Sequence, residues 1–222
     1  MALTTLPANA FVDDAITSDK INLANNFAFT GTVTGTPSGM TLLATSVVSG
    51  TGTTSVQLNN FFNDTLYNAY TIYINNCTPL TNAKILYIRF VAPNGDIITA
   101  SDYVHVVSCT ERNISSDASG NAYNAGEGTF GRINGNVDSS SNDTYATNYI
   151  MHLVDPLNTT SYKSIQWQST GIDQAATGYR TNNGSVWLKQ TAALGGIQFY
   201  FSSGNIAVPT EFRMYGVTKW KN

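Results

Sequence analysis

Charged residues are scarce in this chain. They make up 11% of its 222 residues, whereas a typical soluble protein has about 25%. The net charge is −3, and no run of lysine or arginine occurs. Because nucleic-acid binding needs clustered basic side chains, we expect no nucleic-acid partner.

Cysteine and histidine are rare as well, with two of each. Cys77 and Cys109 are too few for a disulfide scaffold, so we expect two reduced, partly buried thiols. Each stands near the end of an expected strand, which leaves a contact between them open. Together with the distant His105 and His152 they match no zinc spacing. We therefore expect no metal and no other cofactor.

Long apolar runs are missing too. No stretch approaches the roughly 20 residues that cross a membrane. The first twenty residues lack the basic start and the apolar run of a secretory signal. We therefore expect no membrane insertion, and synthesis in a cytoplasm.

Threonine, serine, asparagine and glycine take the place of the missing charge. Threonine and aromatic residues favour strands, whereas asparagine, glycine and serine favour tight turns. From Met40 onward, short strand-like segments follow one another with hardly any helical periodicity. We predict an all-β fold, a jelly-roll-like antiparallel β-sandwich of about ten strands over residues 40–222. The expected strands are 41–49, 54–61, 69–75, 84–92, 97–108, 128–137, 148–154, 161–169, 177–190 and two within 196–217.

Side-chain alternation assigns faces to some of these strands. Leu86, Ile88 and Phe90 share the expected core face, while Arg89 faces water. The following "APNGDI" (92–97) predicts a hairpin turn of type I′ at Asn94-Gly95.

The end of the chain, "GIQFYFSSGNIAVPTEFRMYGV" (196–217), predicts a closing hairpin. Its first strand places Ile197, Phe199 and Phe201 on the core face. Its second places Phe212 and Met214 on one face. The "SSGN" stretch between them is expected to reverse the chain.

Two polar segments, 111–127 and 138–148, are predicted as loops. The acidic residues mostly stand beside turn signals, where they cap turns. Glu111 and Glu127 border the first loop and are a conceivable glycosidase pair. No GxSxG elbow occurs, and both histidines fall within expected strands. We expect a protein that is not an enzyme.

The first 39 residues differ from the rest of the chain. Their apolar residues are too few for an independent core, so the segment needs other chains to pack against. We predict a short extended or helical segment that serves attachment or trimerisation, with a linker ending near Gly39. The apolar residues expected to make these contacts are Phe11, Ile16, Ile21, Leu23, Phe27 and Phe29.

Three stretches carry a resemblance to a known class. They are "ITSDKINLANNFAFTGTVTG", "YNAYTIYINNCTPLTNAKILYIRFVAPNGDIITASDYVHV" and the closing "GGIQFYFSSGNIAVPTEFRMYGV", about half of the chain. Together they resemble tail-fibre and other structural proteins of bacteriophage virions, cyanophages included. The resemblance implies a homotrimer on the tail or capsid surface of a virion. It also implies attachment to other virion proteins through the N-terminal segment and a C-terminal β-sandwich.

The expected function is recognition of a host surface by the sandwich, through a glycan or a protein. Tyr123 and Tyr145 are the loop aromatics expected to stack on sugar rings, with hydrogen bonds from Asn124 and Asn148. A capsid decoration, head-fibre or adaptor protein with a purely structural role is an alternative. A glycan-degrading tailspike is another, although the chain lacks the repeated coils of β-helical depolymerases.

Overall fold

The described part of the protein is built from strands. A computed structural model describes residues 39–81, 83–113, 119–133, 146–172 and 178–219, and for 111–113 and 119–127 it describes the backbone alone. The expected N-terminal segment therefore lies outside the described residues. The strands are β1 (Met40–Val47), β2 (Ser55–Asn59), β3 (Tyr67–Cys77), β4 (Leu86–Val91), β5 (Tyr103–Asn113), β6 (Ser119–Gly128), β7 (Gly131–Arg132), β8 (Thr147–Val154), β9 (Lys163–Ile172), β10 (Gly178–Leu188), β11 (Gly196–Phe201) and β12 (Glu211–Thr218).

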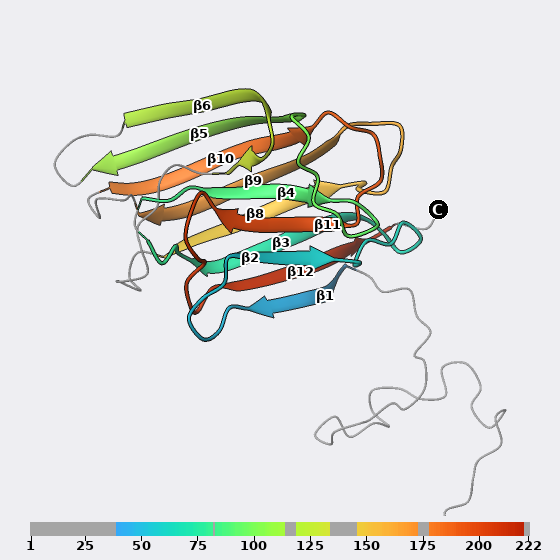
Figure 1. Ribbon diagram of the computed structural model, residues 1–222, viewed down its shortest axis with the longest axis horizontal. Helices are drawn as coiled ribbons and strands as arrows, with labels where there is room; N and C mark the ends of the chain where they lie inside the picture. Colours follow the sequence, from blue (N-terminus) through green and yellow to red (C-terminus); the bar gives the residue numbers. More distant parts are fainter. Residues whose placement is uncertain (1–38, 82, 114–118, 134–145, 173–177, 220–222) are drawn as a thin grey trace, which may run out of the picture. The chain divides into compact units, whose positions relative to one another are not determined.

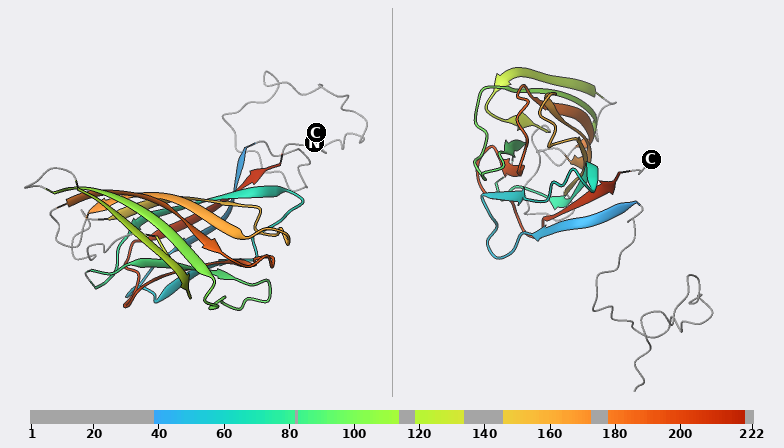
Figure 2. Two further views of the ribbon diagram at one scale, coloured as in Figure 1. Left: turned by 90° about the horizontal axis from the view of Figure 1, so that it is seen from above. Right: turned by 90° about the vertical axis from the view of Figure 1, so that its right-hand side faces the viewer.

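The strands form two antiparallel sheets that pack face to face. The larger sheet has eight strands in the order β1-β12-β3-β8-β9-β10-β5-β6, and the smaller has four in the order β2-β11-β4-β7. In Figure 1 the larger sheet runs from β6 at the top to β1 at the bottom, with β4, β11 and β2 in front. Figure 2 shows the two layers from above and from one end.

Eight of the strands are paired as a jelly roll. β1 pairs with β12, β2 with β11, β3 with β8, and β4 with β7. These pairs are nested in the sequence, and successive pairs alternate between the two sheets. This nested and alternating order arises when one long hairpin wraps around a core. It is the strand order of jelly-roll sandwiches. The predicted all-β, jelly-roll-like fold is confirmed.

Two inserted hairpins extend the larger sheet beyond the jelly roll. β5 and β6 pair with each other, as do β9 and β10. β5 also pairs with β10, and β9 with β8, so both hairpins join the same sheet. The prediction of a loop over 111–127 was therefore wrong, because β5 continues to Asn113 and β6 begins at Ser119.

The core lies between the sheets and follows the predicted alternation. Leu86, Ile88 and Phe90 are fully buried, as are Ile197 and Phe199. The remaining members of the large apolar cluster come from both sheets and include Tyr70, Ile72, Ile74, Tyr149, Met151, Leu153, Ile165, Trp167, Phe212 and Met214. Their burial explains why each of these strands alternates apolar with polar residues.

The two sheets are also joined by a hydrogen-bonded tyrosine. The hydroxyl of Tyr103, on β5, accepts a hydrogen bond from the backbone N–H of Phe90 at 2.8 Å. It donates another to the carbonyl of Ile98 at 3.0 Å. Burial raises the pKa of this phenol, so it remains a donor. These two hydrogen bonds hold the first residue of the β5–β6 hairpin against the smaller sheet. β5 begins at Tyr103, whereas the sequence predicted a strand from Ile97.

The end of the chain is not a hairpin, contrary to the sequence prediction. β11 lies in the smaller sheet between β2 and β4, whereas β12 lies in the larger sheet between β1 and β3. Residues 202–210 carry the chain from one sheet to the other, and Ile206 forms bridges with Thr53 and Pro79. Each strand has the predicted core face, but the two faces meet across the core instead of lying side by side.

The "APNGDI" turn is present in a different form. The Gly95 N–H donates to the Ala92 carbonyl at 2.9 Å, and the Ala92 N–H donates to the Asp96 carbonyl at 2.8 Å. Gly95 has a φ of 91°, and Asn94 is not among the described residues with positive φ. Pro93 favours the first central position of a type I turn, and glycine favours the left-handed position after it. The type I′ assignment was therefore wrong.

Both cysteine side chains are buried thiols, as expected for Cys77 and Cys109. Burial raises the pKa of the Cys77 thiol far above its ordinary value. Because the thiolate is the reactive form, this cysteine is chemically inert in the folded protein.

Candidate binding surface on the larger sheet

The outward side of β8, β9, β10 and β5 forms a surface that we call the polar face. Burial alternates along these strands, so every second side chain points away from the core. Among the outward residues whose side chains the structure describes, which on β5 end at Thr110, none is aspartate, glutamate, lysine or arginine. They are Asn148, Ile150, His152, Val154, Ser164, Gln166, Gln168, Thr170, Ile172, Tyr179, Thr181, Asn183, Ser185, Trp187, Val104, Val106, Ser108 and Thr110.

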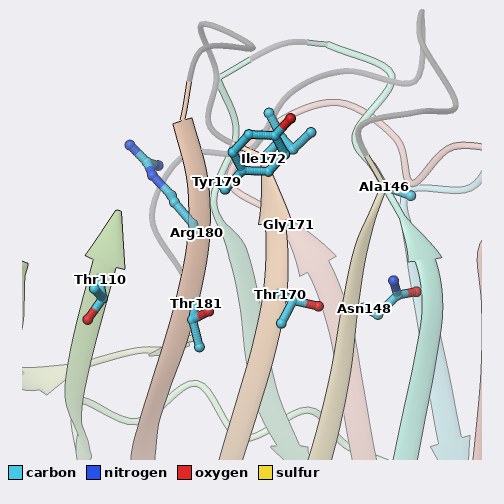
Figure 3. A pocket seen from close by; sticks show the side chains of 9 residues that line it. All are labelled: Thr110, Ala146, Asn148, Thr170, Gly171, Ile172, Tyr179, Arg180 and Thr181. Atoms are coloured by element: carbon cyan, nitrogen blue, oxygen red, sulfur yellow. The ribbon is translucent and has the colours of Figure 1, made fainter. Parts of the chain in front are cut away.

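A row of polar side chains crosses the polar face near the ends of its strands. Thr181 is the register partner of both Thr110 and Thr170, and Thr170 is the partner of Asn148. These four residues line a shallow hollow of about 480 Å³, the first hollow. Figure 3 shows their side chains in one line across the strands. The row therefore offers three hydroxyl groups and one carboxamide to a ligand.

Tyr179 and Ile172 form the raised end of the first hollow. They are register partners on β10 and β9, and their side chains lie next to each other above the row in Figure 3. Tyr179 is 64% exposed, which is high for an aromatic side chain. Its ring is a ready contact surface for an apolar ligand face.

A second hollow of about 460 Å³ follows along the same strands. Asn183 pairs with both Ser108 and Gln168, and Ser185 pairs with both Val106 and Gln166. The small residues Ser108, Ser185 and Gly184 leave space between the longer side chains. His152, on β8, borders the hollow on one side. Amide groups both donate and accept hydrogen bonds, so this hollow can match hydroxyl groups in either role.

His152 is linked to the neighbouring strand. Its Nδ1 lies 3.3 Å from the hydroxyl oxygen of Thr71, its register partner on β3. This contact holds the imidazole at the border of the second hollow.

Trp187 stands at the other end of β10 from Tyr179. Its side chain is 42% exposed, and its indole N–H donates to the hydroxyl of Ser185 at 3.2 Å. Both aromatic residues belong to the outward set of the same strand. The polar face is thus bordered by an aromatic ring at each end of β10.

The sequence predicted one of the residues that line the first hollow. Asn148 lies there, and its side-chain oxygen accepts a hydrogen bond from the Asn76 N–H at 2.9 Å. Tyr123 and Asn124 belong to β6, opposite Val107 and Val106, and not to a loop as predicted. Tyr145 and the six apolar residues of the N-terminal segment lie outside the described residues.

The other residues of the polar face were missed by sequence reasoning, although a signal existed. In "SIQWQST" the buried Ile165 and Trp167 alternate with the exposed Gln166, Gln168 and Thr170. A strand whose outward residues are all uncharged amides and hydroxyls is a candidate for binding, because exposed strands usually carry charge.

The conceivable glycosidase pair is separated by the sheet register. Glu111 pairs with Ser119 at one end of the β5–β6 hairpin, while Gly128, the neighbour of Glu127, pairs with Tyr103 at the other. Eight residues along a strand correspond to about 26 Å, whereas a glycosidase pair needs roughly 5–10 Å. These two carboxylates cannot act together at one bond.

The described residues carry no signature of a metal site or of a membrane-spanning helix. No group of three or more histidine, cysteine, aspartate or glutamate side chains is placed there to hold a metal ion. No helix in that part of the chain has the length and apolarity to cross a membrane. Comparison of the whole chain with protein-family models and with curated proteins gave no match.

Proposed function

We propose that this protein is a non-enzymatic virion fibre protein, a homotrimer whose β-sandwich recognises a glycan on the host surface. In this proposal the N-terminal segment joins the three chains and attaches them to other virion proteins. The resemblance of three stretches of the sequence to phage fibre proteins supports the virion setting. The polar face supports the glycan.

The composition of the polar face is the observation that carries this proposal. A solvent-exposed sheet surface that serves solubility alone carries roughly a quarter to a third of charged residues, whereas the described outward side chains of β8, β9, β10 and β5 include no Asp, Glu, Lys or Arg. Sugars combine hydroxyl groups with apolar C–H faces. Hydroxyl and amide side chains match the former, and exposed aromatic rings match the latter.

Binding to purified polysaccharides tests the proposal. The full chain is presented to capsular, O-antigen and cell-envelope polysaccharides of the host, neutral and acidic, and retention is measured by biolayer interferometry. The paired substitution Gln168→Ala with Asn183→Ala removes two facing amides of the second hollow. We expect it to weaken binding about tenfold or more, because each lost hydrogen bond contributes about 1 kcal/mol.

Tyr162→Ala is the matched control, because Tyr162 is 56% exposed and lines neither hollow. It should bind like the wild type. If no host polysaccharide is retained by the full chain, the glycan-recognition proposal is wrong. Release of reducing sugar during the incubation would contradict the non-enzymatic part.

A purely structural role on the capsid is the second candidate function, and one observation favours it. β1 is an edge strand of the larger sheet, and its Met40, Leu42 and Val47 are 46%, 51% and 56% exposed. Exposed apolar residues on an edge strand suit contact with another subunit. Labelling of the chain on intact particles separates the candidates: tail location supports the fibre, and head location supports the decoration protein.

A further inference from the structure

We infer that the ligand is an uncharged glycan chain that lies along β10, with one sugar ring stacked on Tyr179 and another on Trp187. This inference rests on the proposed function and adds the direction, the minimum length and the charge of the ligand. The outward residues of β10 carry it: Tyr179, Thr181, Asn183, Ser185 and Trp187.

The spacing of the two aromatic rings sets the length of the ligand. Tyr179 and Trp187 are eight residues apart on one strand, a separation of about 26 Å. A single sugar ring cannot contact both. An extended chain of several rings can, and Tyr179 and Trp187 are 64% and 42% exposed for such stacking.

The two hollows give the chain a continuous path between the rings. The first hollow includes Tyr179 and Thr181, and the second includes Asn183 and Ser185, so they follow one another along β10. Thr170, Gln168 and Gln166 of β9 are the register partners of Thr181, Asn183 and Ser185. Each step along β10 therefore presents a pair of polar groups to successive sugar units.

The scarcity of charge among the described side chains sets the chemistry of the ligand. Among the residues that line the two hollows, Arg180 is the one with a permanently charged side chain. Figure 3 shows its guanidinium directed away from the row of Thr181 and Thr170. Among the described side chains, an acidic polymer would therefore meet one cation, at the end of the path near Tyr179, and none from Thr181 to Trp187, whereas a neutral chain loses no ionic hydration on binding.

Graded fragments of the polysaccharide retained by the full chain test this inference. Fragments from partial hydrolysis are separated by length, and their affinities are measured by isothermal titration calorimetry. We expect affinity to rise with length until the fragment spans both rings and then to level off. Tyr179→Ala and Trp187→Ala should each weaken long fragments about five- to tenfold and both together more strongly. Tyr179→Phe should bind almost normally, because the stacking ring remains.

Salt dependence tests the charge of the ligand in the same titrations. Affinity should stay within about twofold between 50 mM and 500 mM NaCl, because screening acts on charged pairs. Far-UV circular dichroism of each variant shows whether it is folded, and Tyr162→Ala should match the wild type.

The results separate this inference from the function on which it rests. Binding that is independent of Tyr179 and Trp187 would overturn the inference while leaving glycan recognition intact. Saturation of the affinity by a single sugar, or steep loss of binding in salt, would do the same. If the full chain binds no polysaccharide, both the inference and the proposed glycan recognition fail.

Discussion

The rings of Phe199 and Phe212 lie 5.2 Å apart between centroids, although they belong to strands of different sheets. Both side chains are fully buried. Phe199 lies on β11 and Phe212 on β12, and the segment between these strands crosses from the smaller sheet to the larger one. The contact therefore ties together the two strands that complete the jelly roll.

Truncation of either ring should strongly destabilise the sandwich. We expect Phe199→Ala and Phe212→Ala each to lower the free energy of unfolding by about 3–5 kcal/mol, the usual cost of removing a buried ring. Because the rings touch, the double variant should lose less than the sum, by about 0.5–1.5 kcal/mol. Urea titration followed by circular dichroism measures all three. Strict additivity would show that the ring contact contributes nothing of its own.

Lys163, the first residue of β9, also connects separate parts of the chain. The residue is 1% exposed, and its ammonium group donates to the carbonyls of Asn158, Ser161 and Thr191, the last two at 2.9 and 3.0 Å. The side-chain oxygen of Asn158 in turn accepts hydrogen bonds from the backbone of Thr160 and Ser161. One buried cation thus holds two loops at the same end of the sandwich.

Lys163→Met should therefore destabilise the protein. The methionine keeps most of the volume but leaves three carbonyl groups without their donor, and we expect a loss of about 2–4 kcal/mol. Lys84→Met, which lies outside this cluster, should change the free energy of unfolding by less than about 0.5 kcal/mol. Chemical denaturation of the two variants side by side provides the comparison. Equal stability of both would contradict a role for the ammonium group in holding the loops.

A buried histidine should make stability depend on pH. Burial, and to a smaller extent the positive charge of Arg132, lowers the pKa of His105 below its ordinary 6.5. Between that lowered pKa and 6.5, the unfolded chain binds a proton that the folded chain does not. The free energy of unfolding should therefore be greatest above pH 6.5 and should decrease as the pH falls through this window.

His105→Gln should remove this contribution. Its free energy of unfolding should change less than that of the wild type between pH 7.5 and pH 5. His152→Gln removes the other histidine, which lies on the polar face, and should retain the contribution of His105. Thermal unfolding at a series of pH values measures the three proteins. A His105→Gln variant with the wild-type pH dependence would assign that dependence to other groups.

The strands of the core were predictable because alternation is a local property. Leu86, Ile88 and Phe90 face the core as the sequence indicated. Alternation does not say which sheet a strand joins, so β11 and β12 were taken for one hairpin. β6 was missed because "SGNAYNAGEG" has low strand propensity, and its pairing with β5 determines its structure.

The polar face was less predictable, because it is defined by register. Thr110, Asn148, Thr170 and Thr181 come from four strands, of which β8, β9 and β10 follow one another in the sequence and β5 is distant from them. Each residue alone is unremarkable as a solvent-facing position. Their alignment depends on how the two inserted hairpins pair with each other. No local sequence pattern predicts that β5 lies beside β10.

The proposed assembly of three chains through the N-terminal segment gives a further prediction. The apolar residues between Phe11 and Phe29 are too few for a core within one chain, whereas residues 39–219 already contain the jelly roll with its own core. A chain that begins at Gly39 should therefore fold but lose the trimer. Multi-angle light scattering should give three times the chain mass for the full protein and the single mass for the shorter one. Circular dichroism should show the same strand content per sandwich in both. If the shorter chain remains a trimer, the sandwich carries the association, and the exposed edge strand β1 becomes the first surface to mutate.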